Sequence, residues 1–326
     1  MSATTVSHAL NQRLNTRVAD ATRQRIEKTA REMGYSPNPF ARALRTNRSY
    51  TLALLSDEIA TTPYAGRLIL GAQETASQLG YVLLIMTTGG DVLVEEREIE
   101  TVWRYQVDGV LYAGTSHRLL TVPASLSGKP VYVVNAESAD EQHSCIYPNE
   151  QQGGLVATRE LTAAGHRIIG FVNTGEKIPA RLGRLEGYRT ALAEAEIPYR
   201  RRLVVQGRGS FAGDGYLAAS KLLAQEDRPT ALFCFNDRMA MGAYRAAHEM
   251  GLAIPRDLSI VGFDNQAIVA DALSPPLTTV ALPYYEMGAM AVEELVAGLD
   301  GNHSGFPPAK IAFPNAVVRR ESVRRI

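Results

Sequence analysis

The sequence of 326 residues predicts an α/β fold in which two lobes each contain a doubly wound parallel sheet. Short, uninterrupted runs of Val, Ile and Leu recur from Thr51 onward, which is typical of strands buried on both faces of a sheet. Segments of helical length separate these runs, and their apolar residues recur every three to four positions. Because strand and helix alternate along the chain, we expect the strands to run parallel.

Eight apolar runs are expected to form these strands. They are TLALLS from Thr51, YVLLIMTT from Tyr81, DGVLYAG from Asp108, PVYVVN from Pro130, RIIGFVN from Arg167, RLVVQG from Arg202, TALFCFN from Thr230 and LSIVGFDN from Leu258. Gly80 and Gly165 follow the last periodic residue of two intervening segments, which is a signal for the end of a helix.

The division into two lobes follows from two breaks in this pattern. YPNEQQGG from Tyr147 separates two units, and the Pro-rich SPPLTTVALP from Ser274 is expected to return the chain toward the first unit. We therefore expect a head at residues 1–35 and a linker at 36–50. The first lobe is expected at 51–148 plus about 283–310, and the second at 149–282 plus about 311–326.

Charge is distributed unevenly along a chain that is neutral overall. Residues 1–50 contain nine Lys or Arg and three Asp or Glu, whereas the remaining residues contain 25 and 31 respectively. A basic head on an acidic body is expected of a module that binds a polyanion, joined to a module that does not. The alternative is that the basic residues only form a solvated helix face.

Several classes of protein are not indicated by the sequence. The cysteines Cys145 and Cys234 stand apart and are expected to be buried apolar side chains of a cytoplasmic protein. The longest apolar run, VLLIM at 82–86, is too short to span a bilayer, and no signal peptide is indicated, so no membrane partner is expected. The six histidines show no spacing typical of metal ligands. We therefore expect no metal, no cofactor and no catalytic residue.

Polar residues directly follow most of the apolar runs. In open α/β sheets, ligands bind in the crevice beside the carboxyl ends of the strands. Two lobes with facing strand ends would form a cleft rich in hydrogen-bonding groups, suited to a polyol or a nucleobase. The alternative is that Asn and Asp only cap the helices that follow. These residues are Ser56, Asp57, Thr87, Thr88, Asn135, Asn173, Asn236, Asp237, Asp264 and Asn265.

The head is expected to contain two helices. Ser2 caps a first helix that ends near Asn11, and its small or hydrogen-bonding residues can approach base edges in a major groove. These residues are Ala3, Thr4, Ser7 and His8, while Val6, Ala9 and Leu10 are expected to pack inward. A second helix is expected to begin at Asp20 or Thr22 and to end at Gly34, with an apolar stripe formed by Ile26, Ala30 and Met33.

The linker contains a helix too short to be stable alone. Pro37 and Pro39 prevent the preceding helix from continuing, and PFARALR is shorter than the ~12 to 15 residues that form a helix in water. Arg42 and Arg45 can contact phosphates, and Leu44 can insert between base steps in the minor groove. As an alternative, Phe40 and Leu44 dock on the α/β body.

Motifs along nearly the whole chain resemble one family. SATTVSHALN, followed by RVADATRQRIEKTAREMGYSPNPFARALRTNRS, is similar to the recognition helix, third helix and hinge helix of the lactose-repressor (LacI) family. The resemblance continues in DGVLYAG, GHRIIGFVN, GRLEGYRTAL, FNDRMAMGAYRAAHEMGL, IPRDLSIVGFDN and PPLTTV. It implies a homodimeric transcriptional regulator that binds double-stranded operator DNA. Its core would be similar to periplasmic sugar-binding proteins and would bind a small polar effector, for which a sugar or sugar derivative is favoured over the alternative of a purine.

The resemblance also implies roles for individual residues. Ala3, Thr4 and His8 fall at base-reading positions, and Leu44 falls at the intercalating position. Tyr64 matches the aromatic residue that stacks on the effector. Arg184, Asn236 and Asp264 match polar effector contacts, and Asn135 and Tyr147 are further candidates. As written, the chain is expected to begin inside the helix-turn-helix, without the first helix of that motif.

Two other classes of function stay open at this point. One is a cytosolic solute sensor that does not bind DNA, which the missing first helix favours. The other is an α/β enzyme, for which Asp57, Asp237 and Asp264 are possible acids or bases. The glycine stretch GRGSFAGDG from Gly207 has neither dinucleotide-binding spacing nor a P-loop lysine, and no GxSxG motif is present. The sequence therefore favours a regulator over an enzyme.

Overall fold

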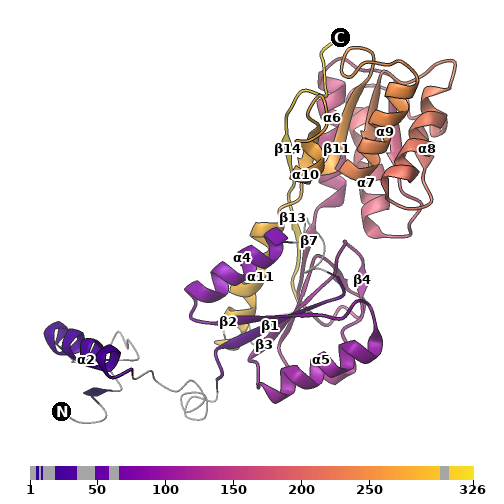
Figure 1. Cartoon of the computed structure of the whole chain (residues 1–326). Coiled ribbons are helices and arrows are strands. Elements are labelled where there is room, and N and C mark those ends of the chain that lie inside the picture. The colour runs from indigo at the N-terminus through magenta and orange to yellow at the C-terminus, as the bar shows by residue number, and fades with distance from the viewer. Residues whose placement is uncertain (1–4, 7–8, 10–18, 35–47, 59–65, 302–307) are drawn as a thin grey trace.

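The computed structural model describes residues 5–6, 9, 19–34, 48–58, 66–301 and 308–326. The body consists of two lobes, each built on a six-stranded sheet with helices on both faces (Figure 1). All strand pairs of the first sheet are parallel, and in the second sheet only the edge strand is antiparallel. This confirms the predicted α/β fold with two doubly wound lobes.

The first lobe has the strand order β13-β7-β5-β3-β1-β2. Helices α4 and α11 pack together on one face of this sheet, and α5 covers the other face. The strands are β1 (Thr51–Ser56), β2 (Val82–Thr87), β3 (Gly109–Ala113), β5 (Val131–Val134), β7 (Cys145–Pro148) and β13 (Lys310–Phe313). The helices are α4 (Gly66–Gln78), α5 (Val92–Arg104) and α11 (Tyr284–Leu299); β4 (Leu119–Leu120) and β6 (Glu137–Ser138) form a small separate sheet.

The second lobe has the strand order β14-β12-β11-β10-β8-β9. Helices α6 and α7 pack together, as do α8 and α9, and the two pairs enclose the sheet. The strands are β8 (Ile169–Asn173), β9 (Val204–Gln206), β10 (Ala231–Cys234), β11 (Ser259–Asp264), β12 (Thr278–Ala281) and β14 (Ala316–Val318). The helices are α6 (Glu150–Ala163), α7 (Pro179–Glu194), α8 (Ala212–Leu223), α9 (Asp237–Glu249) and α10 (Ala267–Ala270).

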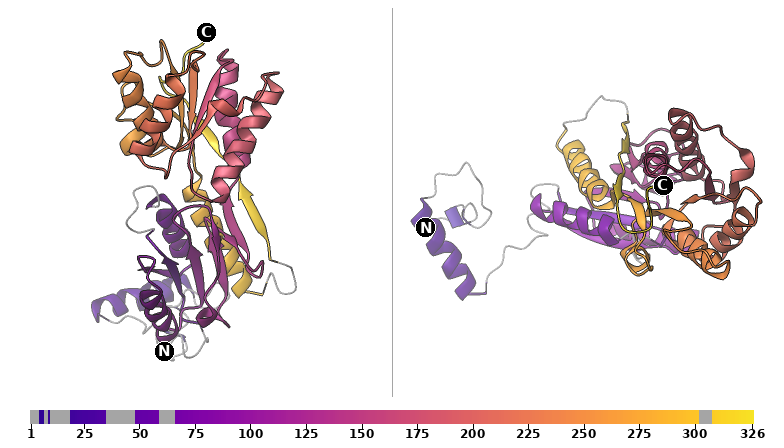
Figure 2. Two further views of the ribbon diagram at one scale, coloured as in Figure 1. Left: turned by 90° about the vertical axis from the view of Figure 1, so that its right-hand side faces the viewer. Right: turned by 90° about the horizontal axis from the view of Figure 1, so that it is seen from above.

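Three crossings join the lobes, which lie one above the other in the left view of Figure 2. They lie between β7 and α6, between β12 and α11, and between β13 and β14. The expected boundary between the last segment of the first lobe and the last segment of the second lobe, near residue 310, lies three residues before the end of strand β13. Lys310–Phe313 pair with β7 of the first sheet, so the chain leaves the first lobe only at Pro314. The final segment is short and half-exposed, and its apolar pattern therefore did not reveal which sheet it joins.

The predicted strands differ from the structure mainly at the sheet edges. The interior strands β3 and β8 are buried at every residue, as their uninterrupted apolar runs predict. The expectation of two buried faces is wrong for β2, where Val82 is 61% exposed, because β2 is an edge strand. The segment from Ser274, expected as a crossing, also contains strand β12. Gly80 and Gly165 have positive φ values at helix ends, as predicted.

In the head, the second helix, α2, spans Asp20–Glu32. Ile26 is buried and Gly34 has a φ of +63°, which fits the predicted stripe and helix end. Met33 is 77% exposed, so its expected place in the stripe is wrong; it lies just beyond the last helical residue. Thr5, Val6 and Ala9 are helical and Ala9 is buried. The base-reading and linker candidates Ala3, Thr4, Ser7, His8, Arg42, Leu44 and Arg45 lie outside the described residues.

Candidate functional site

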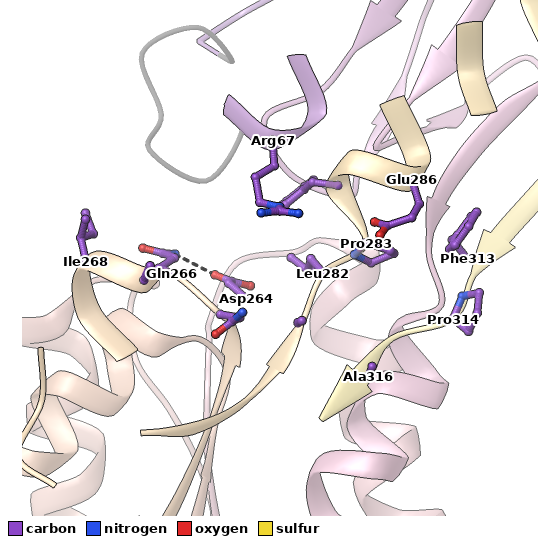
Figure 3. A pocket seen from close by; sticks show the side chains of 14 residues that line it. Arg67, Asp264, Gln266, Ile268, Leu282, Pro283, Glu286, Phe313, Pro314 and Ala316 are labelled. Carbon is purple, nitrogen blue, oxygen red and sulfur yellow. Dashed lines mark hydrogen bonds between the residues drawn. The ribbon is translucent and has the colours of Figure 1, made fainter. Parts of the chain in front are cut away.

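A cleft between the lobes contains two adjoining hollows that share Asp264, Leu282 and Tyr284. The outer hollow has a volume of about 690 Å³ and the inner one about 60 Å³. Figure 3 shows Arg67 and Glu286 of the first lobe facing Asp264 and Gln266 of the second across the outer hollow. Both hollows lie where strands of the two lobes end, as expected for a ligand site in this architecture.

Arg184, on helix α7, lines the inner hollow. Its side chain is 5% exposed, and its Nε donates to Glu150 Oε2 at 2.7 Å, while Nη1 donates to the carbonyl oxygen of Phe235. Nη1 also lies 3.8 Å from Asp264 Oδ1. The guanidinium carbon lies 3.6 Å from the centre of the Phe263 ring, which is a cation–π contact. Arg184 is thus held by charge and by stacking before any ligand binds.

Glu150, the first residue of α6, is buried beside Arg184. Burial alone would raise the pKa of Glu150, but the charge of Arg184 and the contact with His117 at 3.4 Å hold it below its ordinary value. Glu150 is therefore an anion inside the protein. It balances the charge of Arg184, so the pair is stable only while both partners are present.

Asp264 lies at the end of β11 with a φ of 100°, so its backbone turns sharply there. Gln266 Nε2 donates to Asp264 Oδ2 at 3.0 Å (Figure 3). Burial raises the pKa of Asp264 to about 6, although Arg184 and Gln266 oppose this shift. A carboxyl group at the junction of both hollows can accept hydrogen bonds from ligand hydroxyls.

Asp237 supports the loop that carries Asp264. It is fully buried, and its Oδ2 accepts from the backbone N–H of Gln266 at 2.7 Å while Oδ1 accepts from the Thr279 hydroxyl. Burial, with a smaller contribution from the charge of Asp264, raises the pKa of Asp237 to about 8. Asp237 therefore has a structural role, although the sequence placed it among the possible acids or bases.

We expect Asp237 to make stability fall as the pH rises. The folded chain holds this proton more tightly than the unfolded chain, so its contribution is complete below about pH 4 and is lost by about pH 8. Between about pH 5 and 7, where the unfolded chain has lost this proton and the folded chain keeps it, the slope is ~1.4 kcal/mol per pH unit. Asp237→Asn should remove this pH dependence, because Asn does not titrate. The fold should be kept, since Asn can accept from the N–H of Gln266 and donate to the hydroxyl of Thr279. Urea unfolding at several pH values checks this, and equal slopes would contradict it.

The structure brings most of the sequence candidates together. Arg184, Asn135, Asn236 and Asp264 all line the inner hollow. Asn135 Nδ2 donates to the carbonyl oxygen of Gly114, while Asn135 Oδ1 has no hydrogen-bond partner among the described residues. Asn236 lines the inner hollow, and its Oδ1 also accepts from the N–H of Met239. Asn236 therefore caps helix α9, which is the alternative role given above for Asn and Asp residues after strands.

Two candidates lie elsewhere. Tyr147 is outside the described lining of both hollows and stacks on His117, with ring centres 4.7 Å apart. Tyr64 lies outside the described residues. Conversely, the sequence did not indicate His117, Glu150 and Tyr284, which line the inner hollow. Glu150 and Tyr284 are the first residues of helices that directly follow lobe crossings, and this position would have been the signal.

Other expectations concern chemistry outside the cleft. Cys145 and Cys234 are both buried, as predicted, and burial raises the pKa of each thiol. Within the described ranges, no helix is both long and apolar enough to span a bilayer. The same part of the chain contains no group of three His, Cys, Asp or Glu residues placed to hold a metal ion.

Comparison with known proteins gives consistent matches along the chain. Residues 158–323 match the model of a periplasmic binding protein-like domain, and residues 1–38 match that of bacterial regulatory proteins of the lacI family. The ribose operon repressor of Haemophilus influenzae is 34% identical over 324 residues, covering 99% of this chain and 95% of that protein.

Solved structures agree with these matches. A putative transcriptional regulator of the same family from Rhizobium etli has a TM-score of 0.75 and 32% identity, covering 85% of this chain and 100% of that chain. The complex of the transcriptional regulator CelR with cellobiose has a TM-score of 0.69 and 27% identity, covering 99% of this chain and 96% of that chain.

Proposed function

Because this chain belongs to the lacI family of bacterial regulatory proteins, we propose that a sugar or sugar derivative bound between its lobes controls its binding to operator DNA. The protein acts in the cytoplasm as a homodimer. The observation that carries the proposal is the cleft itself, in which Arg184, Asp264 and Asn135 meet beside the crossings that join the lobes. The relatives are repressors rather than enzymes, which is consistent with this role.

The chemistry of the inner hollow supports a hydroxyl-rich effector. Asn135 is 2% exposed and its Oδ1 has no described partner, so a ligand donor would satisfy a buried acceptor. Asp264 supplies further acceptor oxygens at the junction of the hollows. The names of two similar proteins also refer to sugars, the ribose operon repressor and the CelR–cellobiose complex.

The attachment of the linker to the first lobe supports coupling between the cleft and DNA. Arg48 donates to Asp300 Oδ1 and to the carbonyl oxygen of Leu299, at the C-terminal end of α11. The backbone N–H groups of Ser49 and Tyr50 donate to the two carboxylate oxygens of Asp108, each at 2.8 Å. The linker is therefore tied to the body of the first lobe.

The N-terminal residue of α11 is Tyr284, which lines both hollows. A movement of the first lobe therefore displaces the point from which the linker leaves it. In a dimer, the distance between the two departure points decides whether two hinge helices can pair on DNA. By linkage, the effector and the operator must change each other's affinity by the same factor, typically about 5- to 150-fold.

The direct test is DNA binding by the full chain. An operator is selected from random duplex DNA, and its affinity is measured over a range of salt concentrations. We expect log K to fall linearly with log salt, and Arg45→Ala to reduce the slope by about one. Arg159→Ala, an exposed change on α6, should leave both affinity and slope unchanged. A chain that binds sugar but no duplex would instead be a solute sensor.

A further inference from the structure

One contact in the cleft joins the two lobes through ionisable side chains. His117 comes from the first lobe, in the loop after β3, and its side chain is 5% exposed. Its Nε2 lies 3.2 Å from Glu137 Oε1, and its Nδ1 lies 3.4 Å from Glu150 Oε1. Glu137 belongs to the first lobe and Glu150 to the second. His117 thus lies between carboxylates of different lobes.

The surroundings of His117 fix its position from two sides. Its ring stacks on Tyr147, with ring centres 4.7 Å apart and an angle of 18° between the planes. Asp57 holds the loop on both sides of His117, because it accepts from Thr115 and from Arg118. These contacts fix the His117 ring to the first lobe. Its distance from Glu150, which belongs to the second lobe, therefore changes when the two lobes move relative to each other.

The chemistry of this arrangement links His117 to Arg184. The two ring nitrogens of His117 face one carboxylate oxygen from each lobe, with Nε2 at hydrogen-bond distance from Glu137 and Nδ1 at ion-pair distance from Glu150. The remaining oxygen of Glu150, Oε2, accepts from Arg184 Nε at 2.7 Å, and Arg184 in turn lies 3.8 Å from Asp264. A row of polar contacts therefore runs from Glu137 through His117, Glu150 and Arg184 to Asp264.

We propose that His117 is a positioning residue that sets the angle between the lobes and, through Glu150, the availability of Arg184 to an effector. This inference rests on the proposed function, since it assumes that the effector binds in this cleft. Glu150 is shared between His117 and Arg184 in the arrangement observed here. When the lobes move apart at this point, Glu150 loses His117 and is left to Arg184 alone.

His117, Glu150 and Arg184 are all buried, so the contacts of Glu150 with the other two residues are sensitive to lobe movement. Removing one partner from a buried ion pair is costly, because the remaining charge has no water to compensate it. A ligand that draws Arg184 toward itself leaves Glu150 dependent on His117, which favours the lobe arrangement in which His117 is close. The positions of the lobes and the pairing of Arg184 with Glu150 are therefore coupled.

The test measures the distance between the lobes without effector or DNA. Spin labels are attached to Glu100→Cys in α5 and Lys221→Cys in α8, both at exposed positions in different lobes. The native cysteines are buried and should not react. Pulsed electron paramagnetic resonance should give a broader distance distribution, with a displaced mean, for His117→Ala than for the parent. Glu150→Gln and Glu137→Gln should change it in the same direction, the latter less.

The matched control is Glu194→Gln, which breaks an exposed pair with Arg159 inside the second lobe and should leave the distances unchanged. Circular dichroism shows whether each variant is folded; if His117→Ala is not, Glu137→Gln decides the question. Coincident distributions for the parent and the folded variants would overturn the proposal. That result would not affect the proposed function, because DNA binding is measured in a separate experiment. If DNA binding were absent, the distances between the spin labels would still test the role of His117.

Discussion

Arg184→Met is expected to lower the free energy of unfolding by about 3–5 kcal/mol, because it leaves the carboxylate of Glu150 buried without its principal partner. Methionine fills a similar volume, so the cost comes from charge and hydrogen bonding rather than from an empty space. The cation–π contact with Phe263 is also lost. Urea unfolding at pH 7 gives the change directly.

Two controls separate this effect from a general effect of removing arginine. Arg159→Met removes a partner of Glu194 at the surface, where each side chain is about half exposed, and should cost at most ~1 kcal/mol. The double variant Arg184→Met with Glu150→Gln removes both buried charges and should recover more than half of the loss. If the double variant were as unstable as the sum of the single variants, the buried pair would not be the cause.

Gly187→Ala is expected to destabilise the second lobe by about 3 kcal/mol, at the upper end of overpacking effects. A Cβ at this position would lie 2.1 Å from the carbonyl oxygen of Gln151 and 2.4 Å from the backbone nitrogen of Leu155. These are backbone atoms of α6, so the two helices must move apart. The same movement would separate Arg184 on α7 from Glu150 on α6, and ligand binding should weaken as well.

Gly298→Ala is the matched control, because Gly298 is also in a helix, α11, but no atom lies within 4 Å of the added Cβ. We expect this change to stabilise the protein slightly, by up to ~1 kcal/mol, through the higher helix propensity of alanine. Thermal unfolding of both variants checks the comparison. Equal effects at the two positions would mean that helix contact is not what requires glycine at 187.

The interior of the fold could be predicted because its strands are long enough and apolar enough to be recognised locally. The run DGVLYAG predicted β3, and RIIGFVN predicted β8, since both are buried on two faces. The edges were less predictable. The strand β14 has three residues and is partly exposed, so its pairing with β12 depends on a partner distant in the sequence.

The candidate site shows the same division. Arg184, Asn236 and Asp264 could be selected because they follow strand ends or match family motifs, and the structure places all three around the inner hollow. His117 carries no such signal, and Glu150 has only its position after a lobe crossing. Both become significant because the fold brings His117 Nδ1 within 3.4 Å of Glu150 Oε1. A contact between residues that lie far apart in the chain has no local periodicity to reveal it.

The sequence by itself determined the alternation of strands and helices, the basic head, the family and the polar residues at strand ends, because each of these is a local pattern of side chains. Only the tertiary structure decided which of those polar residues meet, that Glu150 and Arg184 form a buried pair, and that His117 joins the lobes. The physical reason is that the burial and the pairing of a charged side chain depend on how segments far apart in the sequence pack together. The free energy of that charge depends on both its burial and its partner.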